Sequence, residues 1–191
     1  NSISEITDVQ ISLVSQTEDN WNKWIKGTIG YIDIEWYPPM PAPWIITSNT
    51  TVTENKYVRG DIIVQNGATL TIASGKHINF DTGQAGTNYG GDASRSELVL
   101  EDGGTLVLES NAKLTCSAGY WGGVYVIGDC YITFGAGSII EKARIGVFAN
   151  GYTRIEGPTA SSHGIIQNCE IDGVFVQDNH AYIAKMDIID C

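Results

Sequence analysis

The feature of this sequence that most constrains its fold is an internal copy at a fixed distance. Residues 61–80, DIIVQNGATLTIASGKHINF, align without a gap with residues 97–116, ELVLEDGGTLVLESNAKLTC, at an offset of 36. The residues between the aligned apolar positions are mostly polar, which predicts strands of period two with one buried face. The aligned apolar pairs are Ile62/Leu98, Val64/Leu100, Leu70/Leu106, Ile72/Leu108, Ile78/Leu114 and Phe80/Cys116.

Each copy also contains a turn signal between its first two apolar runs. Asn66-Gly67 and Asp102-Gly103 occupy aligned positions, where glycine adopts a positive φ without a Cβ clash. The copies are separated by residues 81–95, DTGQAGTNYGGDASR, which lack an apolar pattern. Without these fifteen residues the repeat is 21 residues long. We therefore expect residues 81–95 to form a loop that projects from one corner of a repeat.

Looser copies follow toward the C-terminus. IIEKARIGVF (139–148) matches IIQNCEIDGVF (165–175) at an offset of 26 with one extra residue, and MDIIDC (186–191) begins another copy. The Asn-Gly and Asp-Gly turns also favour an antiparallel meander. A meander does not require the inward residues of successive units to match at a constant offset, whereas stacked coils do. The sequence therefore predicts an all-β solenoid, a parallel β-helix.

Residues 1–50 do not follow the repeat, and prolines 38, 39, 41 and 43 favour an extended connection there. We interpret 1–50 as an N-terminal cap or small leading β domain with a Pro-rich connector, followed by repeats over 51–191. The chain lacks an initial methionine, which fits either removal of a leader or a piece of a longer protein. Because it stops in mid-repeat, we expect a fragment that is truncated at the C-terminus. Four tryptophans of the leader are predicted either to cap open strand edges or to contact a glycan or partner. They are Trp21, Trp24, Trp36 and Trp44.

Charge and hydropathy exclude several partners. Twenty-two acidic and eleven basic residues give a formal net charge of −11, which opposes attraction to nucleic acid and to anionic membranes. The chain has no apolar run long enough to form a membrane-spanning helix. We therefore expect no nucleic-acid partner and no membrane span.

The four cysteines contain no CxxC pair, so the pattern does not favour a zinc or thioredoxin-like site. Cys169 and Cys191 are 22 residues apart, close to one repeat. Equivalent positions on neighbouring strands lie about 4.8 Å apart, within reach of a disulfide. Both a Cys169–Cys191 disulfide and a set of buried free thiols fit the sequence.

The segments NKYVRGDIIVQNGATLTI, AGYWGGVYVIG, GSIIEKARIGVFA and GIIQNCEIDGVFV resemble secreted β-helix proteins of Bacteroidota. Many of these are cargo of the type IX secretion system, although the sorting domain of that system is absent from these residues. The resemblance spans roughly 51–191. It implies a right-handed parallel β-helix, export through the outer membrane to the cell surface or medium, and contact with the secretion machinery.

The same resemblance assigns a place to Trp121-Gly122-Gly123, which looks like the step that opens a coil in these proteins. We expect the large ring to close the stack beside glycines that permit a tight approach.

The rival hypothesis is a β-helix polysaccharide lyase or glycoside hydrolase. That chemistry needs clustered carboxylates, or a basic residue near bound calcium, on one outward face. Glu101, Asp102 and Glu109 are interpreted as solvated surface. We assign no catalytic residue.

Metal binding by the chain is predicted at one place only. Asp81, Asn88 and Asp92 of the loop form the one calcium candidate, because hard oxygen ligands suit that ion, although a plain loop is the simpler interpretation. No other cofactor is expected.

The sequence thus predicts an exported, non-catalytic β-helix module of a larger surface or secreted protein. It would act as a stalk, adhesin or secretion-system passenger, with a surface glycan or a protein as partner. The alternative is a β-helix that binds or degrades polysaccharide.

Overall fold

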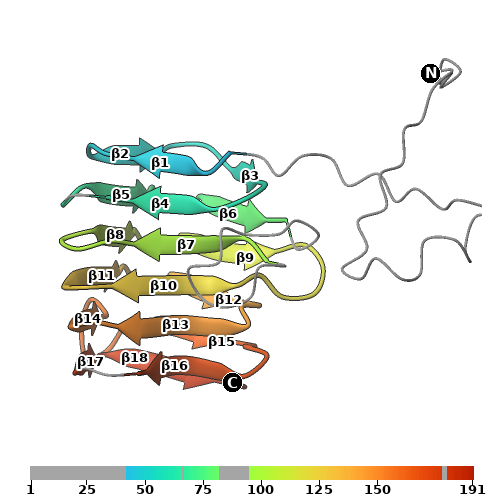
Figure 1. Cartoon of the computed structure of the whole chain (residues 1–191). Coiled ribbons are helices and arrows are strands. Elements are labelled where there is room, and N and C mark those ends of the chain that lie inside the picture. The colour runs from blue at the N-terminus through green and yellow to red at the C-terminus, as the bar shows by residue number, and fades with distance from the viewer. Residues whose placement is uncertain (1–41, 66, 82–94, 178–179) are drawn as a thin grey trace, which may run out of the picture. The chain divides into compact units, whose positions relative to one another are not determined.

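The computed structural model describes residues 42–65, 67–81, 95–177 and 180–191. All regular structure in these ranges is β, in three six-stranded parallel sheets that we name A, B and C (Figure 1). Sheet A consists of β1 (Trp44–Ile46), β4 (Ile62–Val64), β7 (Glu97–Leu100), β10 (Gly123–Ile127), β13 (Ile145–Asn150) and β16 (Asp172–Val176). Sheet B consists of β2 (Thr50–Val52), β5 (Thr69–Ile72), β8 (Thr105–Leu108), β11 (Cys130–Phe134), β14 (Thr153–Glu156) and β17 (Ala181–Ala184). Sheet C consists of β3 (Lys56–Val58), β6 (His77–Phe80), β9 (Lys113–Cys116), β12 (Ile139–Glu141), β15 (Gly164–Gln167) and β18 (Met186–Ile189).

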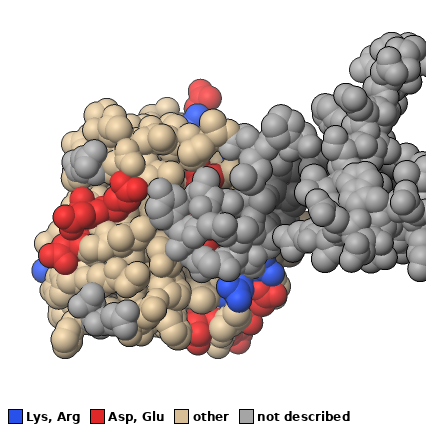
Figure 2. Space-filling view, in the orientation of Figure 1, with Lys and Arg blue, Asp and Glu red and all other residues tan. Residues whose placement is uncertain are grey.

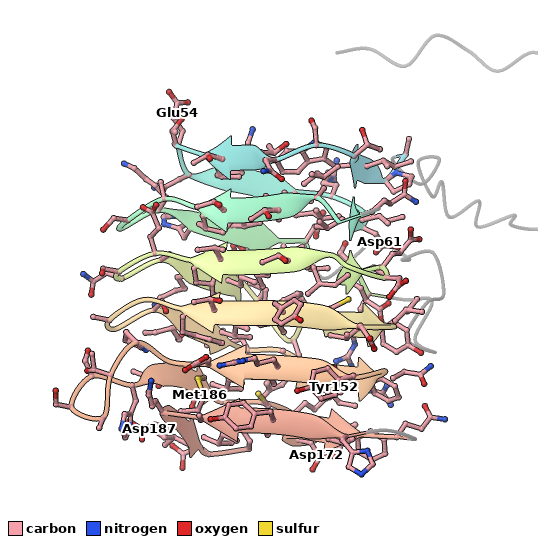
Figure 3. The ribbon with its side chains drawn as sticks, turned by 90° about the vertical axis from the view of Figure 1, so that its left-hand side faces the viewer. Glu54, Asp61, Tyr152, Asp172, Met186 and Asp187 are labelled. Carbon is pink, nitrogen blue, oxygen red and sulfur yellow. The ribbon has the colours of Figure 1, made fainter. Side chains whose placement is uncertain are left out.

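Three consecutive strands make one coil, and each coil gives one strand to each sheet. Every strand pairs in parallel with the strand three places along the chain, so six coils lie in layers, as Figures 1 and 3 show from two directions. The strands β4 and β5, which flank the Gly67 turn, pair with β7 and β8 rather than with each other. The predicted parallel β-helix is therefore confirmed, and the antiparallel meander is wrong.

The register matches the pairs that the sequence alignment gives. Ile62 pairs with Leu98, Leu70 with Leu106, and Phe80 with Cys116, and all six aligned apolar pairs lie in the buried core. The turn glycines Gly67 and Gly103 have φ of 73° and 78°, as the turn signals predict. Each inward side chain is thus covered by its equivalent in the next coil.

The first coil begins at Trp44, seven residues before the Thr51 boundary expected from the sequence. Trp44 pairs with Ile62 and packs against the core, and the Lys56 ammonium lies 5.2 Å from its ring centroid, a cation–π distance. The repeat is less visible here because Trp44 and Ile62 are only 18 residues apart, far from the offset of 36 in the next coil. Residues 1–41 of the predicted leader lie outside the described residues.

The step that opens the fourth coil places a tryptophan inside the core. The Trp121 ring is fully buried and stacks on Phe80, with centroids 4.2 Å apart and planes 1° from parallel. Its Nε1 donates a hydrogen bond to the Glu141 carbonyl oxygen over 2.9 Å. Gly123 has φ of 112°, and a Cβ there would collide with the Ile145 carbonyl oxygen. The glycine therefore permits the close approach of coils that was expected beside this ring.

The two ends of the stack differ in how well they cover the core. In the first coil the inward residues Ile46, Val52 and Val58 are buried. In the sixth coil Ile183 and Ile188 continue the inward rows of sheets B and C, yet they are 41% and 48% exposed. Coverage of inward side chains comes from the neighbouring coil and is incomplete at this end.

We expect Trp121→Ala to destabilise the protein by about 3 to 5 kcal/mol, because it removes a fully buried ring and leaves a cavity against Phe80. Denaturant unfolding monitored by circular dichroism measures the change. Tyr131→Ala, at a half-exposed position on the outer face of sheet B, is the control and should shift stability by less than about 1 kcal/mol. Equal losses in both variants would contradict the assigned core position.

Candidate binding surface on sheet C

The outer face of sheet C carries a continuous row of polar side chains. Because inward and outward residues alternate along a strand, the residues beside the buried Ile78, Leu114 and Ile140 point outward. In register, these outward residues follow one another from coil to coil. The row consists of Tyr57, Asn79, Thr115, Glu141 and Gln167.

A shallow hollow of about 370 Å³ lies over this row, within the size range of small-ligand sites. It spans β6, β9 and β12 and the turn before β6. Its side-chain lining includes Lys76, His77, Asn79, Lys113, Thr115 and Glu141. With Asn111, which also lines the hollow, three amide or hydroxyl groups, three basic groups and one carboxylate thus share a single surface.

Glu141 is the centre of a bonding network that links three coils. Its Oε1 accepts from Thr115 Oγ1 over 3.0 Å and lies 3.1 Å from Lys113 Nζ, and its Oε2 accepts from Gln167 Nε2 over 2.9 Å. Burial alone raises the pKa of Glu141, but the hydrogen bonds from Gln167, Lys113 and Thr115 together hold it below its ordinary value. Glu141 is therefore a stable carboxylate at neutral pH.

Asn79 has an amide oxygen with unmet bonding capacity. Its Nδ2 donates to Ser117 Oγ over 2.6 Å, whereas its Oδ1 is buried and has no hydrogen-bond donor in the described part of the chain. A buried acceptor without a donor costs about 1 to 3 kcal/mol, so a donor in the hollow would be favourable.

Two further groups lie at or next to the hollow, Lys76 in its lining and Tyr57 beyond it. Within the described ranges Lys76 forms no ion pair, in contrast to Lys113, which is paired with Glu141. Tyr57, one coil away from Asn79 in register, is 59% exposed. The hollow is thus lined by an unpaired cation, and Tyr57, whose hydroxyl hydrogen-bonds with Asp81, lies next to it in register.

The calcium candidate falls only partly within the described residues. Asp81 Oδ2 accepts from Arg59 Nε over 2.9 Å, whereas Asn88 and Asp92 lie outside the described residues. In the described ranges no group of three or more His, Cys, Asp or Glu side chains is placed to hold a metal ion. The calcium site stays a prediction.

The acids that the sequence places on the outer surface bond to neighbouring turns. Asp102 Oδ1 accepts from the Asp129 backbone N–H over 3.1 Å, and Glu109 Oε2 accepts from the Ser74 backbone N–H over 2.8 Å. These contacts connect turns of adjacent coils, so these two acids are more than solvated surface.

The cysteine positions follow the predicted spacing. Gln167 pairs with Ile189, which brings Cys169 and Cys191 to equivalent positions on adjacent coils. Both are free thiols in this structure, as are Cys116 and Cys130. Burial, followed by the neighbouring Cys191 thiol, raises the pKa of Cys169 to about 12. A disulfide between the two stays a prediction.

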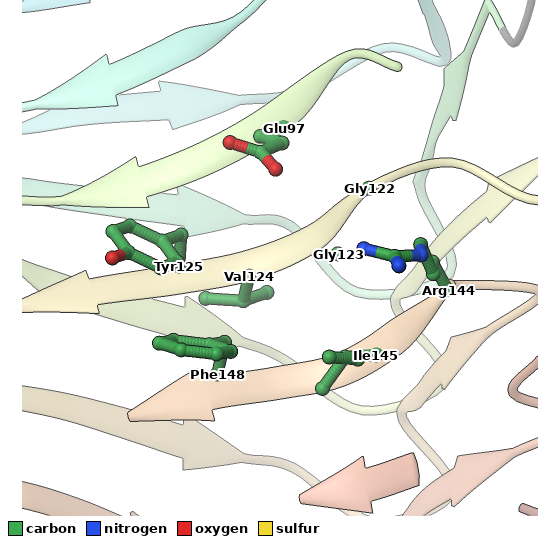
Figure 4. A pocket seen from close by; sticks show the side chains of 8 residues that line it. All are labelled: Glu97, Gly122, Gly123, Val124, Tyr125, Arg144, Ile145 and Phe148. Carbon is green, nitrogen blue, oxygen red and sulfur yellow. The ribbon is translucent and has the colours of Figure 1, made fainter. Parts of the chain in front are cut away.

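Sheet A carries a row of aromatic rings on its outer face that sequence reasoning missed. Tyr125, Phe148 and Phe175 stack at centroid distances of 4.8 and 5.1 Å. The cleft beside Tyr125 and Phe148 has free space of only about 10 Å³, room for no more than a water molecule (Figure 4). Because the rings cover one another's faces, this row stabilises the stack rather than offering a platform to a ligand.

The charged surface follows the acidic composition. In the view of Figure 2 acidic groups form a patch at the left, whereas basic groups are fewer. His163 contacts an acid of the next coil. Its Nδ1 lies 2.7 Å from Asp187 Oδ1, and its Nε2 lies 3.1 Å from the Ala160 carbonyl oxygen. The hydrogen bond with Asp187 raises the pKa of His163.

The proposed contact of the leader tryptophans with a glycan or partner stays a prediction. Three of them lie outside the described residues: Trp21, Trp24 and Trp36.

Sequence reasoning identified part of this surface. The alignment paired His77 with Lys113 and Asn79 with Thr115 on the polar face, and the register confirms both pairs. It missed Glu141, which belongs to a looser copy 26 residues after Thr115. It also missed Lys76, since nothing in its local sequence distinguishes it from any exposed lysine.

Comparison with protein-family models, with curated proteins and with solved structures found no match. The described residues contain no helix that is long and apolar enough to cross a membrane. The proposed function therefore rests on the outer surface of sheet C.

We expect Glu141→Gln to remove an acid-sensitive part of the stability. Because the folded pKa of Glu141 lies below its value in the unfolded chain, the wild type has this contribution above the unfolded pKa and loses it as pH falls through the folded pKa. The variant should therefore be less stable near neutral pH and lose less stability on acidification. Denaturant unfolding at several pH values between neutral and acidic measures this, with the exposed Glu54→Gln as control. Parallel pH profiles for wild type and Glu141→Gln would contradict the network.

Proposed function

We propose that this chain is an exported, non-catalytic β-helix module of a larger surface or secreted protein, which serves as a stalk or adhesin. The observation that supports it best is that the carboxylates of Glu141 and Glu156 bond to side chains of neighbouring coils. Glu141 bonds to residues of the coils on both sides, and Glu156 lies 2.7 Å from Arg154 and 3.2 Å from Lys185. These contacts lower the pKa of both acids, whereas a general acid needs a raised pKa. The carboxylates serve to hold neighbouring coils together.

The architecture suits a rigid spacer. Each coil adds about 4.8 Å along the axis, and its inward residues are fixed by those of its neighbours. A stack of this kind keeps any surface group at a defined distance from its attachment point. The hollow on sheet C gives such a module a surface with which to bind a partner, which supports the adhesin form of the proposal.

Export is proposed from the resemblance to type IX cargo proteins. The full-length protein should then be found at the cell surface or in the medium and be digested by protease added to intact cells. Fractionation followed by immunoblotting measures this, with a cytoplasmic enzyme as the marker of lysis. Protease resistance in intact cells, with digestion only after lysis, would contradict export.

The non-catalytic role is tested by a turnover screen of the purified, folded chain. Neutral and acidic polysaccharides are incubated with the chain, with and without calcium, and unsaturated products and new reducing ends are followed. We expect no product above that of heat-unfolded chain, because Glu141 and Glu156 are held as bonded carboxylates with a lowered pKa. Sustained product formation by folded chain would overturn the proposal in favour of a β-helix lyase or hydrolase.

A further inference from the structure

We propose that the hollow on the outer face of sheet C binds an acidic oligosaccharide, one whose sugar rings carry carboxylate groups. This inference rests on the proposed role of the chain as a binding module. It assigns a ligand class to the surface formed by Lys76, His77, Asn79, Lys113, Thr115 and Glu141.

The charge of the hollow is opposite to that of the whole chain. The formal net charge of the chain is −11, yet the charged side chains that line this one surface are two lysines, Lys76 and Lys113, and one carboxylate, Glu141. The carboxylate of Glu141 is matched by Lys113 at 3.1 Å. Lys76 is then left to face an anion, because it has no ion-pair partner among the described residues. A charge-assisted hydrogen bond from Lys76 to a ligand carboxylate is the interaction that this arrangement provides.

The uncharged groups require a ligand that also donates hydrogen bonds. The Asn79 Oδ1 lacks a donor but is closed to solvent, so a ligand reaches it only when the Asn79 amide turns toward the hollow, and a fully ionised carboxylate or phosphate has no donor to offer. A sugar hydroxyl supplies one while its second bonding site is directed to the solvent. The combination of hydroxyl donors and a carboxylate acceptor in one small unit is the chemistry of a uronic acid.

The spacing of the surface suits a chain of sugars rather than a single one. His77 and Lys113 are register partners on adjacent coils, so their Cα atoms are separated by about 4.8 Å along the helix axis. This is close to the length that one pyranose adds to an extended polysaccharide. Tyr57 continues the row of Asn79 and Thr115 one coil further and is 59% exposed, which leaves a ring face for stacking on a sugar. An oligosaccharide laid along the axis would meet each of these groups in turn.

The test is isothermal titration of the purified chain with short oligomers of galacturonate, glucuronate and mannuronate. The same oligomers with their carboxylates reduced to alcohols are the matched ligands. We expect wild type to bind at least one uronate oligomer, and binding of its reduced form to be weaker. Lys76→Met should weaken binding of the uronate oligomer by about three- to tenfold and leave the reduced oligomer unchanged.

Two further variants separate the site from the fold. Asn79→Ala should weaken both the uronate and the reduced oligomer, because it removes a contact with a hydroxyl. Lys185→Met removes an exposed lysine of the last connection between sheets B and C, four coils from Lys76, and should bind like wild type. Circular dichroism and unfolding curves establish that all variants are folded.

Each outcome has one meaning. Absence of binding by folded wild type to all three uronate oligomers would overturn the inference, as would binding that is insensitive to both Lys76→Met and Asn79→Ala. Either result, without turnover, leaves the proposed stalk or adhesin role standing. Cleavage of a bound oligomer, with binding still sensitive to Lys76→Met, would overturn the non-catalytic role and support the site.

Discussion

The structure depends on the burial of each inward side chain by its equivalent in the next coil. Leu106 lies between Leu70 and Ile132 in register, and all three are buried. A single coil has no interior of its own, so hydrophobic burial and backbone hydrogen bonding both come from neighbours. The exposure of Ile183 and Ile188 in the last coil follows from the same constraint. Stability is therefore a property of adjacent coils, and a change such as the loss of Trp121 acts on the stack around it.

The outer faces are free of this constraint, which allows each sheet a different surface. Sheet A uses its outward positions for a stack of Tyr125, Phe148 and Phe175, whereas sheet C carries the polar row around Glu141. The alternation of inward and outward residues makes the two sets independent, because a strand side chain contacts one face only. For this reason the fold alone does not indicate an activity, and the function is inferred from the outer surface of sheet C.

Charged groups on these faces have a second role in joining coils. Glu141, Glu156 and Glu109 each bond to a residue at least one coil away. For Glu141 and Glu156 these contacts lower the pKa, which favours the ionised form and is unsuited to proton donation. In the hollow the same network leaves Lys76 and the Asn79 oxygen outside it, and the proposed acidic oligosaccharide would complete their interactions.

The sequence by itself determined the architecture, because burial of inward residues against their copies requires a matched offset, and the pairs from Ile62/Leu98 to Phe80/Cys116 record it directly. It also predicted the juxtaposition of Cys169 and Cys191 and the polar character of His77 and Asn79. Only the tertiary structure decided that Trp44 belongs to the first coil, that Trp121 stacks on Phe80, and that Glu141 joins Lys113 to Gln167. The reason is that the offset between paired residues varies from 18 to 36 with the length of the connections. Contacts between outward side chains therefore form only when the coils stack, and no local sequence pattern predicts them.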